Sequence, residues 1–166
     1  MKVNIALLTV TDTRTLDTDK SGAILVEKIK KANHNLVDRK ICKDSKNEII
    51  KILNQWVEKK EIDVIITTGG TGLTGRDITP EALNEIADKH IPGFGEVFRY
   101  LSLETVGTSS IQSRACAILS KGKYIFALPG SSGGVTDAWD KILIHQLDAT
   151  HKPCNFIELL PRLKEK

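Results

Sequence analysis

The stretch Ile62 to Leu83, IDVIITTGGTGLTGRDITPEAL, contains the parts of an α/β unit in order. Its first residues, Ile62 to Thr68, are mostly apolar and β-branched, which is typical of a strand buried inside a sheet. A glycine-rich loop follows, and Thr79 with Pro80 then predicts the start of a helix, with Thr79 as its N-cap. A strand, a polar loop and a helix in this order indicate a fold in which strands and helices alternate.

The same alternation extends along the rest of the chain. Apolar runs predict further strands at Val3–Val10 and Lys123–Gly130, and the alternation of polar and apolar residues predicts another at Asn35–Ile41. The helical spacing of apolar residues predicts helices between them, one of which carries Trp56 on its buried face. We therefore expect an α/β fold with a mostly parallel central sheet, and residues 1–166 are expected to form a single domain.

Local patterns predict where several helices begin and end. Ser21 is expected to cap the first helix, and Ser45 with Glu48 forms a capping box at the start of the next. Pro92 and Gly93 are expected to end the helix that begins at Thr79. The remaining expectations are a helix from about Glu96 to Leu103, a helix or strand within Ser109–Leu119, a helix over Val135–Leu147 and an extended tail from Thr150.

Composition argues against several classes of protein. The formal net charge is only +3 and aromatic residues make up 5%, so a nucleic-acid partner is not expected. The apolar run near the N-terminus is too short to span a membrane, so no membrane association is expected. Cys42, Cys116 and Cys154 show no pairing pattern and are expected to be reduced, buried thiols in a cytoplasmic protein.

The polar loops that follow the strands are the expected ligand-binding region. In parallel sheets, ligands bind beyond the carboxyl ends of the strands. Three loops should gather there, namely Thr11–Ser21, Thr68–Thr79 and Pro129–Gly134.

The glycine loop has the composition of a phosphate-binding loop. Gly69, Gly70, Gly72 and Gly75 let the backbone approach a ligand, and successive N–H groups form an anion-binding concavity. The hydroxyls of Thr68, Thr71 and Thr74 add donors. The spacing fits neither a P-loop, which needs a lysine, nor a dinucleotide-binding loop that opens directly into a helix. A tight structural turn is the alternative interpretation.

Two aspartates predict a magnesium site beside this loop. A carboxylate next to bound phosphate is unfavourable unless a cation lies between them, and Mg²⁺ is typically held by one or two carboxylates with phosphate oxygens. Asp77 lies within the loop, and Asp44 follows a strand at the same end of the sheet. Asp77 could instead be a cap near the helix, and Asp44 a turn residue.

Two further segments contain candidate ligand-binding residues. In LPGSSGG, Ser131 and Ser132 could bind an oxyanion or cap the last helix. In SSIQSR, Arg114 could clamp a phosphate or form a surface ion pair. The histidines have no evident partners in the sequence.

These motifs together resemble the MoaB/MogA family of molybdenum cofactor biosynthesis, and most closely its protein B branch. The resemblance rests on TTGGTGLTGRDITPEA, PGFGEVFRYLS, GTSSIQSRA, LPGS and QLDATHKPCNF, which extend over nearly the whole chain. It implies a three-layer α/β fold and a homo-oligomer, either a trimer or a hexamer made of two trimers. It also implies transfer of AMP from Mg-ATP to molybdopterin with release of pyrophosphate.

The resemblance assigns roles to individual residues. Asp44 and Asp77 match the family's two functional aspartates, with Mg²⁺ as cofactor. Thr68, Gly69, Gly70, Thr71 and Gly72 would cradle the phosphates of ATP. Ser113 would lie near the pterin, and Pro129, Gly130 and Ser131 belong to the second substrate loop.

The chain also departs from the family pattern. After LPGS it reads SGGV, where many relatives have a proline or threonine followed by Lys-Ala, and CKDS surrounds Asp44. These differences keep open a molybdopterin-binding paralogue without catalysis. A hydrolase acting on a nucleotide or pterin amide is a third interpretation, but the sequence shows no nucleophile–base pair for it.

Overall fold

A six-stranded mixed sheet forms the centre of the computed structural model, which describes residues 1–165. The strand order is β2-β1-β3-β6-β5-β4. The first four strands in this order pair in parallel, while β5 is antiparallel to both β6 and β4. The strands are β1 Asn4–Val10, β2 Asn35–Cys42, β3 Val64–Thr68, β4 Lys89–His90, β5 Cys116–Ser120 and β6 Lys123–Leu128. The expected α/β fold with a mostly parallel sheet is confirmed.

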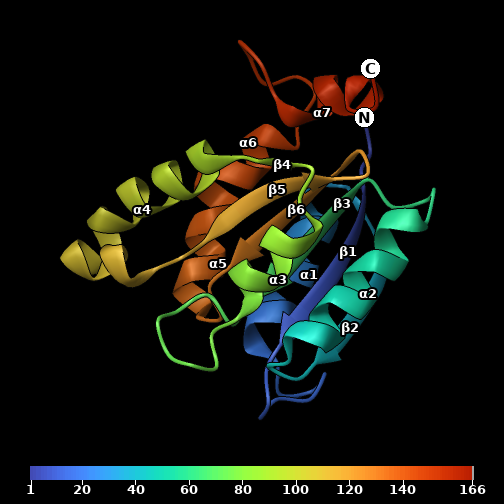
Figure 1. Cartoon of the computed structure of the whole chain (residues 1–166). Helices are drawn as coiled ribbons and strands as arrows, with labels where there is room; N and C mark the ends of the chain where they lie inside the picture. Colours follow the sequence, from blue (N-terminus) through green and yellow to red (C-terminus); the bar gives the residue numbers. More distant parts are fainter. Residues whose placement is uncertain (166) are drawn as a thin grey trace.

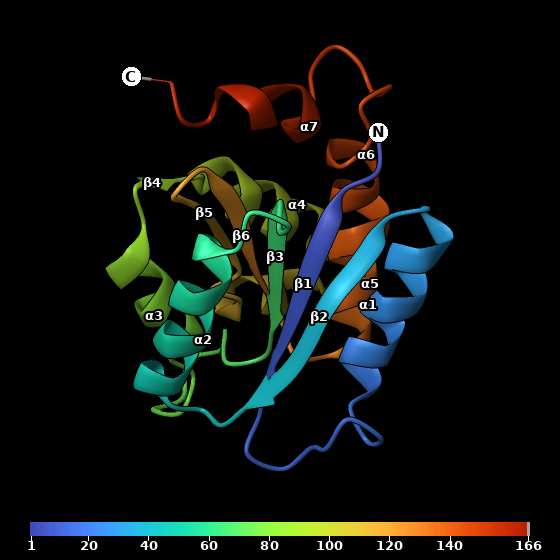
Figure 2. The same cartoon turned by 90° about the vertical axis from the view of Figure 1, so that its right-hand side faces the viewer.

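Helices cover both faces of this sheet, which gives three layers. Figure 2 shows α2 and α3 on one side of the sheet, with α1 and α5 on the other, and Figure 1 shows the long α4 beside β5. The main helices are α1 Lys20–Lys31, α2 Lys46–Glu58, α3 Thr79–Ile86, α4 Pro92–Val106 and α5 Ser132–Ala138. Shorter segments are η1 Gly107–Gln112, η2 Trp139–Leu143, α6 Ile144–Gln146, α7 Phe156–Leu159 and η3 Leu160–Arg162.

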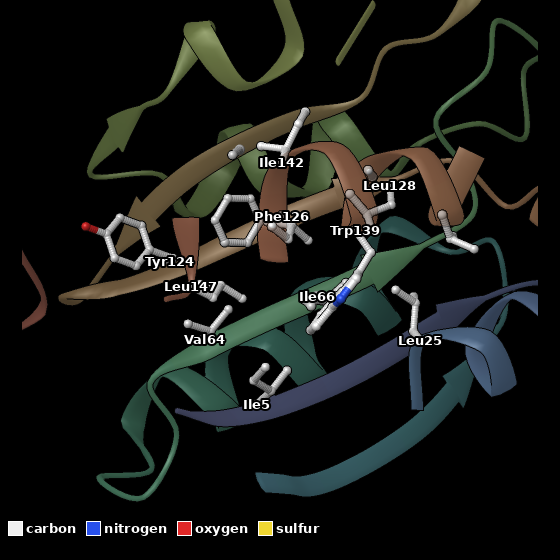
Figure 3. Packing of buried hydrophobic residues seen from close by; sticks show 14 of the residues in the cluster. Ile5, Leu25, Val64, Ile66, Tyr124, Phe126, Leu128, Trp139, Ile142 and Leu147 are labelled. Atoms are coloured by element: carbon white, nitrogen blue, oxygen red, sulfur yellow. The ribbon is translucent and has the colours of Figure 1, made fainter. Parts of the chain in front are cut away.

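Each face of the sheet has its own hydrophobic core. The face under α1, α4 and α5 buries Trp139, Phe126 and Ile66 (Figure 3), and the face under α2 and α3 buries Trp56 and Leu53. Burying a large apolar side chain stabilises the fold by roughly 1.5–3 kcal/mol. Because both faces are covered, the central strands are continuous apolar runs, as the sequence pattern predicted. Trp56 is a core residue as expected.

Two of the three predicted helix caps are wrong, and the third is confirmed. Asp19, not Ser21, caps α1, because its carboxylate accepts the N–H of Gly22 at 2.8 Å. Thr79 lies inside α3, where the N-cap is Ile78, and its hydroxyl donates instead to the carbonyl of Gly69 at 2.8 Å. Ser45 caps α2 as predicted.

The chain between α3 and β5 also differs from the prediction. α3 ends at Ile86, and the short edge strand β4 follows before Pro92 begins α4. Pro92 and Gly93 therefore start a helix and do not end one, since proline at the first helical positions loses no helical hydrogen bond. α4 is longer than the expected Glu96–Leu103. The ambiguous segment resolves into η1 followed by β5.

The tail is not extended as expected, because it folds into α7 and η3. The ring of Phe156 packs on Tyr124, with centroids 4.7 Å apart, so the tail extends the core beyond the sheet. The cysteines are free as predicted, but only Cys42 is fully buried, and Cys154 is exposed.

Candidate functional site

The three predicted loops meet at the carboxyl ends of the parallel strands. A cavity of about 320 Å³ lies between them, with walls from the ends of β1, β3 and β6 and from the start of α1. Thr11, Ser21, Gly69 and Ser131 are among the lining residues and come from all three loops. Figure 2 shows these loops at one end of the sheet, opposite the start of β1 and the segment α7. The prediction that the loops gather here is confirmed.

Gly69 lines this cavity, and its backbone lies very close to the backbone of Val10. Its φ is +101°, in the region that favours glycine, and a Cβ there would lie 2.2 Å from the carbonyl oxygen of Val10. A Cβ on Gly130 would lie 3.3 Å from the Cα of Gly69, so the two glycine-containing loops touch at this point. The glycines thus bring the ends of three strands together.

The threonine hydroxyls of the glycine loop mostly bind protein atoms. Thr68 donates to the carbonyl of Pro129 at 2.8 Å, and Thr74 donates to the Asp77 carboxylate at 2.7 Å. Thr71 is buried. The backbone of the loop is also held to α3, because the carbonyl of Gly70 accepts the N–H of Thr79 at 3.0 Å. The Thr68 and Thr74 hydroxyls are therefore engaged within the protein, and the N–H groups of Gly69 and Thr74 also have protein acceptors, at Leu128 and Asp77.

Asp77 lies inside the glycine loop and organises it. Its Oδ2 accepts the N–H of Thr74 at 2.9 Å as well as the Thr74 hydroxyl. Burial would raise the pKa of Asp77, but the hydrogen bonds from Thr74 and Gly72 and the charge of Arg114 outweigh it, so this pKa lies below its usual value. Asp77 is therefore anionic at neutral pH.

Asp44 lies close enough to Asp77 for the two charges to interact. Burial and the negative charge of Asp77 both raise the pKa of Asp44, and its carboxylate accepts no hydrogen bond from residues 1–165. Its backbone N–H is held by Asp12, at 3.1 Å. An unpaired carboxylate next to a second one is the donor set that a divalent cation would fit.

Other ligands would have to complete such a cation site. Within residues 1–165, no group of three or more His, Cys, Asp or Glu side chains is placed to hold a metal ion. Mg²⁺ does not need three such side chains, because it typically keeps several waters and binds one or two carboxylates together with phosphate oxygens. The residues present therefore fit the predicted ion.

A second, larger cavity of about 680 Å³ adjoins the first. Ser131 and Ser132 line both cavities, so the two cavities are neighbours. Ser113 and Pro129 also line the larger cavity, as does the apolar side chain of Phe98 from α4. Ser131 is also the N-cap of α5, where its Oγ accepts the N–H of Gly134 at 3.1 Å.

Arg114 forms an ion pair, which is one of the two interpretations that the sequence suggested. Its guanidinium binds the carbonyls of Gly72 and Asp77 and the carboxylate of Glu81, so it contacts the glycine loop and the start of α3. The ion-pair interpretation is therefore confirmed, with Glu81 as the partner, and the same guanidinium also binds two loop carbonyls.

Asp19 is a site residue that the sequence analysis missed. It is buried in the wall of the smaller cavity, where Oδ2 accepts the Thr9 hydroxyl at 2.6 Å and Arg39 at 3.1 Å. Burial would raise the pKa of Asp19, but hydrogen bonds from Thr9, Gly22, Arg39 and Ser21 lower it below its usual value. Aspartate is as strong an N-cap as serine, so the residue before Lys20 was a usable signal.

Comparison with known proteins places the chain in a family. The family described as "Probable molybdopterin binding domain" matches residues 6–149. The chain belongs to this family. Among residues 1–165, no helix is both long and apolar enough to cross a membrane.

Within that family, the chain is similar to molybdenum cofactor biosynthesis protein B, which confirms the predicted MoaB/MogA membership. It is 44% identical to the Escherichia coli (strain K12) protein over 152 residues, covering 92% of this chain and 89% of the relative. A crystal structure of a protein B matches with a TM-score of 0.90 and 38% identity, covering 100% and 98%. The tungsten cofactor synthesizing protein MoaB from Pyrococcus furiosus matches with a TM-score of 0.80 and 32% identity, covering 99% and 98%.

Proposed function

We propose that the protein acts in molybdenum cofactor biosynthesis and transfers AMP from Mg-ATP to molybdopterin. The products would be adenylylated molybdopterin and pyrophosphate. The observation that carries this proposal is the pair of adjoining cavities that share Ser131 and Ser132, because a transfer reaction needs two substrates side by side. The family match and the relatives named for this pathway support the choice of pterin.

The residues of the chain would act by positioning and by charge. Transfer of a phosphoryl-type group needs little covalent help from the protein, so N–H donors and cations supply most of the catalysis. The backbone at Gly69 and Gly70 would approach the phosphates closely, and Ser113 would contact the pterin from the larger cavity. Mg²⁺ held by Asp44 and Asp77 would neutralise phosphate charge.

A molybdopterin-binding protein without turnover is the second candidate. One observation favours it, since Thr74 already donates two hydrogen bonds to Oδ2 of Asp77. The sequence SGGV after LPGS also lacks the lysine of many relatives.

The assay should separate these two candidates. Purified protein is incubated with molybdopterin, ATP and Mg²⁺, and pyrophosphate and adenylylated pterin are followed together. We expect both products, and we expect both to vanish without Mg²⁺ and in Asp77→Ala. Asp140→Ala is the matched control, since it removes a carboxylate that pairs with Lys28 outside the site. Tight pterin binding without pyrophosphate would support the second candidate and contradict the first.

We further propose a cytoplasmic homo-oligomer, either a trimer or a hexamer. Val97, Tyr100 and Leu103 expose their apolar side chains along α4, which is typical of a surface covered by another subunit. Free cysteines are compatible with a reducing compartment. Sedimentation of the wild type and of Tyr100→Glu tests the assembly, and we expect the variant to sediment as a smaller species.

A further inference from the structure

Arg114 lies between η1 and β5 and contacts the glycine loop at both of its ends. Its backbone N–H donates to the carbonyl of Thr71 at 2.9 Å, and its Nε donates to the carbonyl of Gly72 at 2.7 Å. Its Nη2 donates to the carbonyl of Asp77 at 2.5 Å. One residue therefore holds the start and the end of the segment 72–77.

The guanidinium is also fixed on its other side. Nη1 binds the carboxylate of Glu81 in the first turn of α3, and the Arg114 side chain is partly buried. All three nitrogens of the guanidinium thus have a protein partner. A planar fork that binds three acceptors in fixed directions leaves the side chain little freedom to turn toward a ligand.

These bonds set the direction of the peptide groups in the loop. The C=O and the following N–H of a trans peptide point in opposite directions. Because the carbonyls of Thr71, Gly72 and Asp77 point toward Arg114, the N–H groups of the next residues point away from it. The N–H of Gly72 accordingly reaches the Asp77 carboxylate.

The same arrangement fixes the Asp77 carboxylate. The backbone carbonyl of Asp77 accepts a hydrogen bond from Nη2 of Arg114, and Oδ2 of Asp77 accepts hydrogen bonds from Thr74. Loss of the guanidinium would leave two loop carbonyls without their donor and would free both ends of the loop. Asp77 would then lose its fixed distance to Asp44.

We propose that Arg114 is a positioning residue, which holds the segment 72–77 and so fixes the position of the Asp77 carboxylate. It does so through the carbonyls of Gly72 and Asp77, without touching a substrate. The consequence for turnover rests on the proposed AMP transfer, while the effect on the loop does not.

Arg114→Lys is the variant that tests this proposal. Lysine keeps the positive charge but cannot bind three acceptors as a planar fork. Arg99→Lys is the matched control, because Arg99 donates to the carbonyls of Ser113 and Ala115 and does not contact the glycine loop. Two readouts are needed, namely amide hydrogen exchange in the ligand-free protein and the kinetics of AMP transfer.

The exchange readout is independent of activity. We expect faster exchange at the amides of Gly72 and Thr74 in Arg114→Lys, with exchange in the central strands unchanged and the loop unaffected in Arg99→Lys. Faster exchange throughout the molecule would show a merely structural role and would overturn the proposal. Unchanged exchange at Gly72 and Thr74 would overturn it equally.

The kinetic readout concerns the position of Asp77. We expect kcat to fall by about ten- to a hundred-fold in Arg114→Lys while KM for molybdopterin stays near that of the wild type, because small displacements of positioned groups are costly. An unchanged kcat would contradict the positioning role. If the wild type transfers no AMP, the proposed function fails, and the exchange result alone still decides whether Arg114 holds the loop.

Discussion

The hydroxyl of Thr68 donates a 2.8 Å hydrogen bond to the carbonyl of Pro129, where β3 and β6 end side by side. Both groups belong to segments that line the cavities, so this bond joins the glycine loop to the LPGSS loop at their base. Thr68 is fully buried.

Thr68→Val should therefore destabilise the protein. The change keeps the side-chain shape but leaves a buried carbonyl unsatisfied, which costs about 1–3 kcal/mol. Urea unfolding measures the loss, and Thr68→Ser, which keeps the hydroxyl, should lose less. Equal losses in the two variants would show that packing and not the hydrogen bond matters here.

Gly69→Ala should destabilise the protein, while Gly75→Ala should not. Gly69 has φ of +101° and no room for a Cβ, whereas a Cβ on Gly75 would meet nothing within 4 Å. Forcing a side chain into this backbone region costs about 1–3 kcal/mol. Thermal unfolding measures the midpoint temperature of each variant, and the two positions lie in the same loop. A lower midpoint for Gly75→Ala than for Gly69→Ala would contradict the structure.

Asp19 should make stability depend on pH at the acidic end. Its pKa is lowered in the folded state, so its contribution is present above the unfolded pKa of about 3.9 and is lost as pH falls through the folded pKa. Asp19→Asn should be less stable than the wild type at neutral pH, by about 1–3 kcal/mol. Denaturant unfolding at several pH values should show that the difference in unfolding free energy between the wild type and Asp19→Asn becomes smaller toward strong acid. Asp17→Asn, at an exposed position, serves as the control and should be about as stable as the wild type at neutral pH.

Asp44→Ala should reduce AMP transfer without unfolding the protein. Its carboxylate binds no donor among the described residues, so its removal costs little stability. If Asp44 helps to hold Mg²⁺, the variant should need more Mg²⁺ for the same rate. Rates measured over a range of Mg²⁺ concentrations test this. An unchanged Mg²⁺ dependence would make Asp44 a turn residue.

The parallel part of the sheet could be predicted because each of its strands has a recognisable pattern of residues within its own short segment. The parallel strands β1, β3 and β6 are runs of apolar residues bounded by polar loops, and β2 alternates between polar and apolar residues, so each pattern can be read within a few residues. Because parallel strands end at one edge, the meeting of the three loops followed directly.

The antiparallel edge could not be predicted in the same way. β4 has only two residues, and β5 is defined by its pairing with β6 on one side and β4 on the other. Such pairing is a tertiary property and leaves little trace in the composition of a short segment.

The role of Arg114 was also beyond the sequence. Its acceptors at Gly72 and Asp77 are backbone carbonyls, which every residue possesses, so no side-chain type marks them. The caps at Asp19 and Ile78 were missed for a related reason, since neighbouring residues offered equally good local alternatives.

The segment α7 and the start of β1 lie at the pole of the molecule opposite the loops (Figure 2). An affinity tag or a fluorescent protein joined near either end of the chain would therefore extend away from the two cavities. A molecule immobilised on a sensor chip through such a tag would present its loops to the flowing solution, so pterin and nucleotide titrations could be run on the tethered protein.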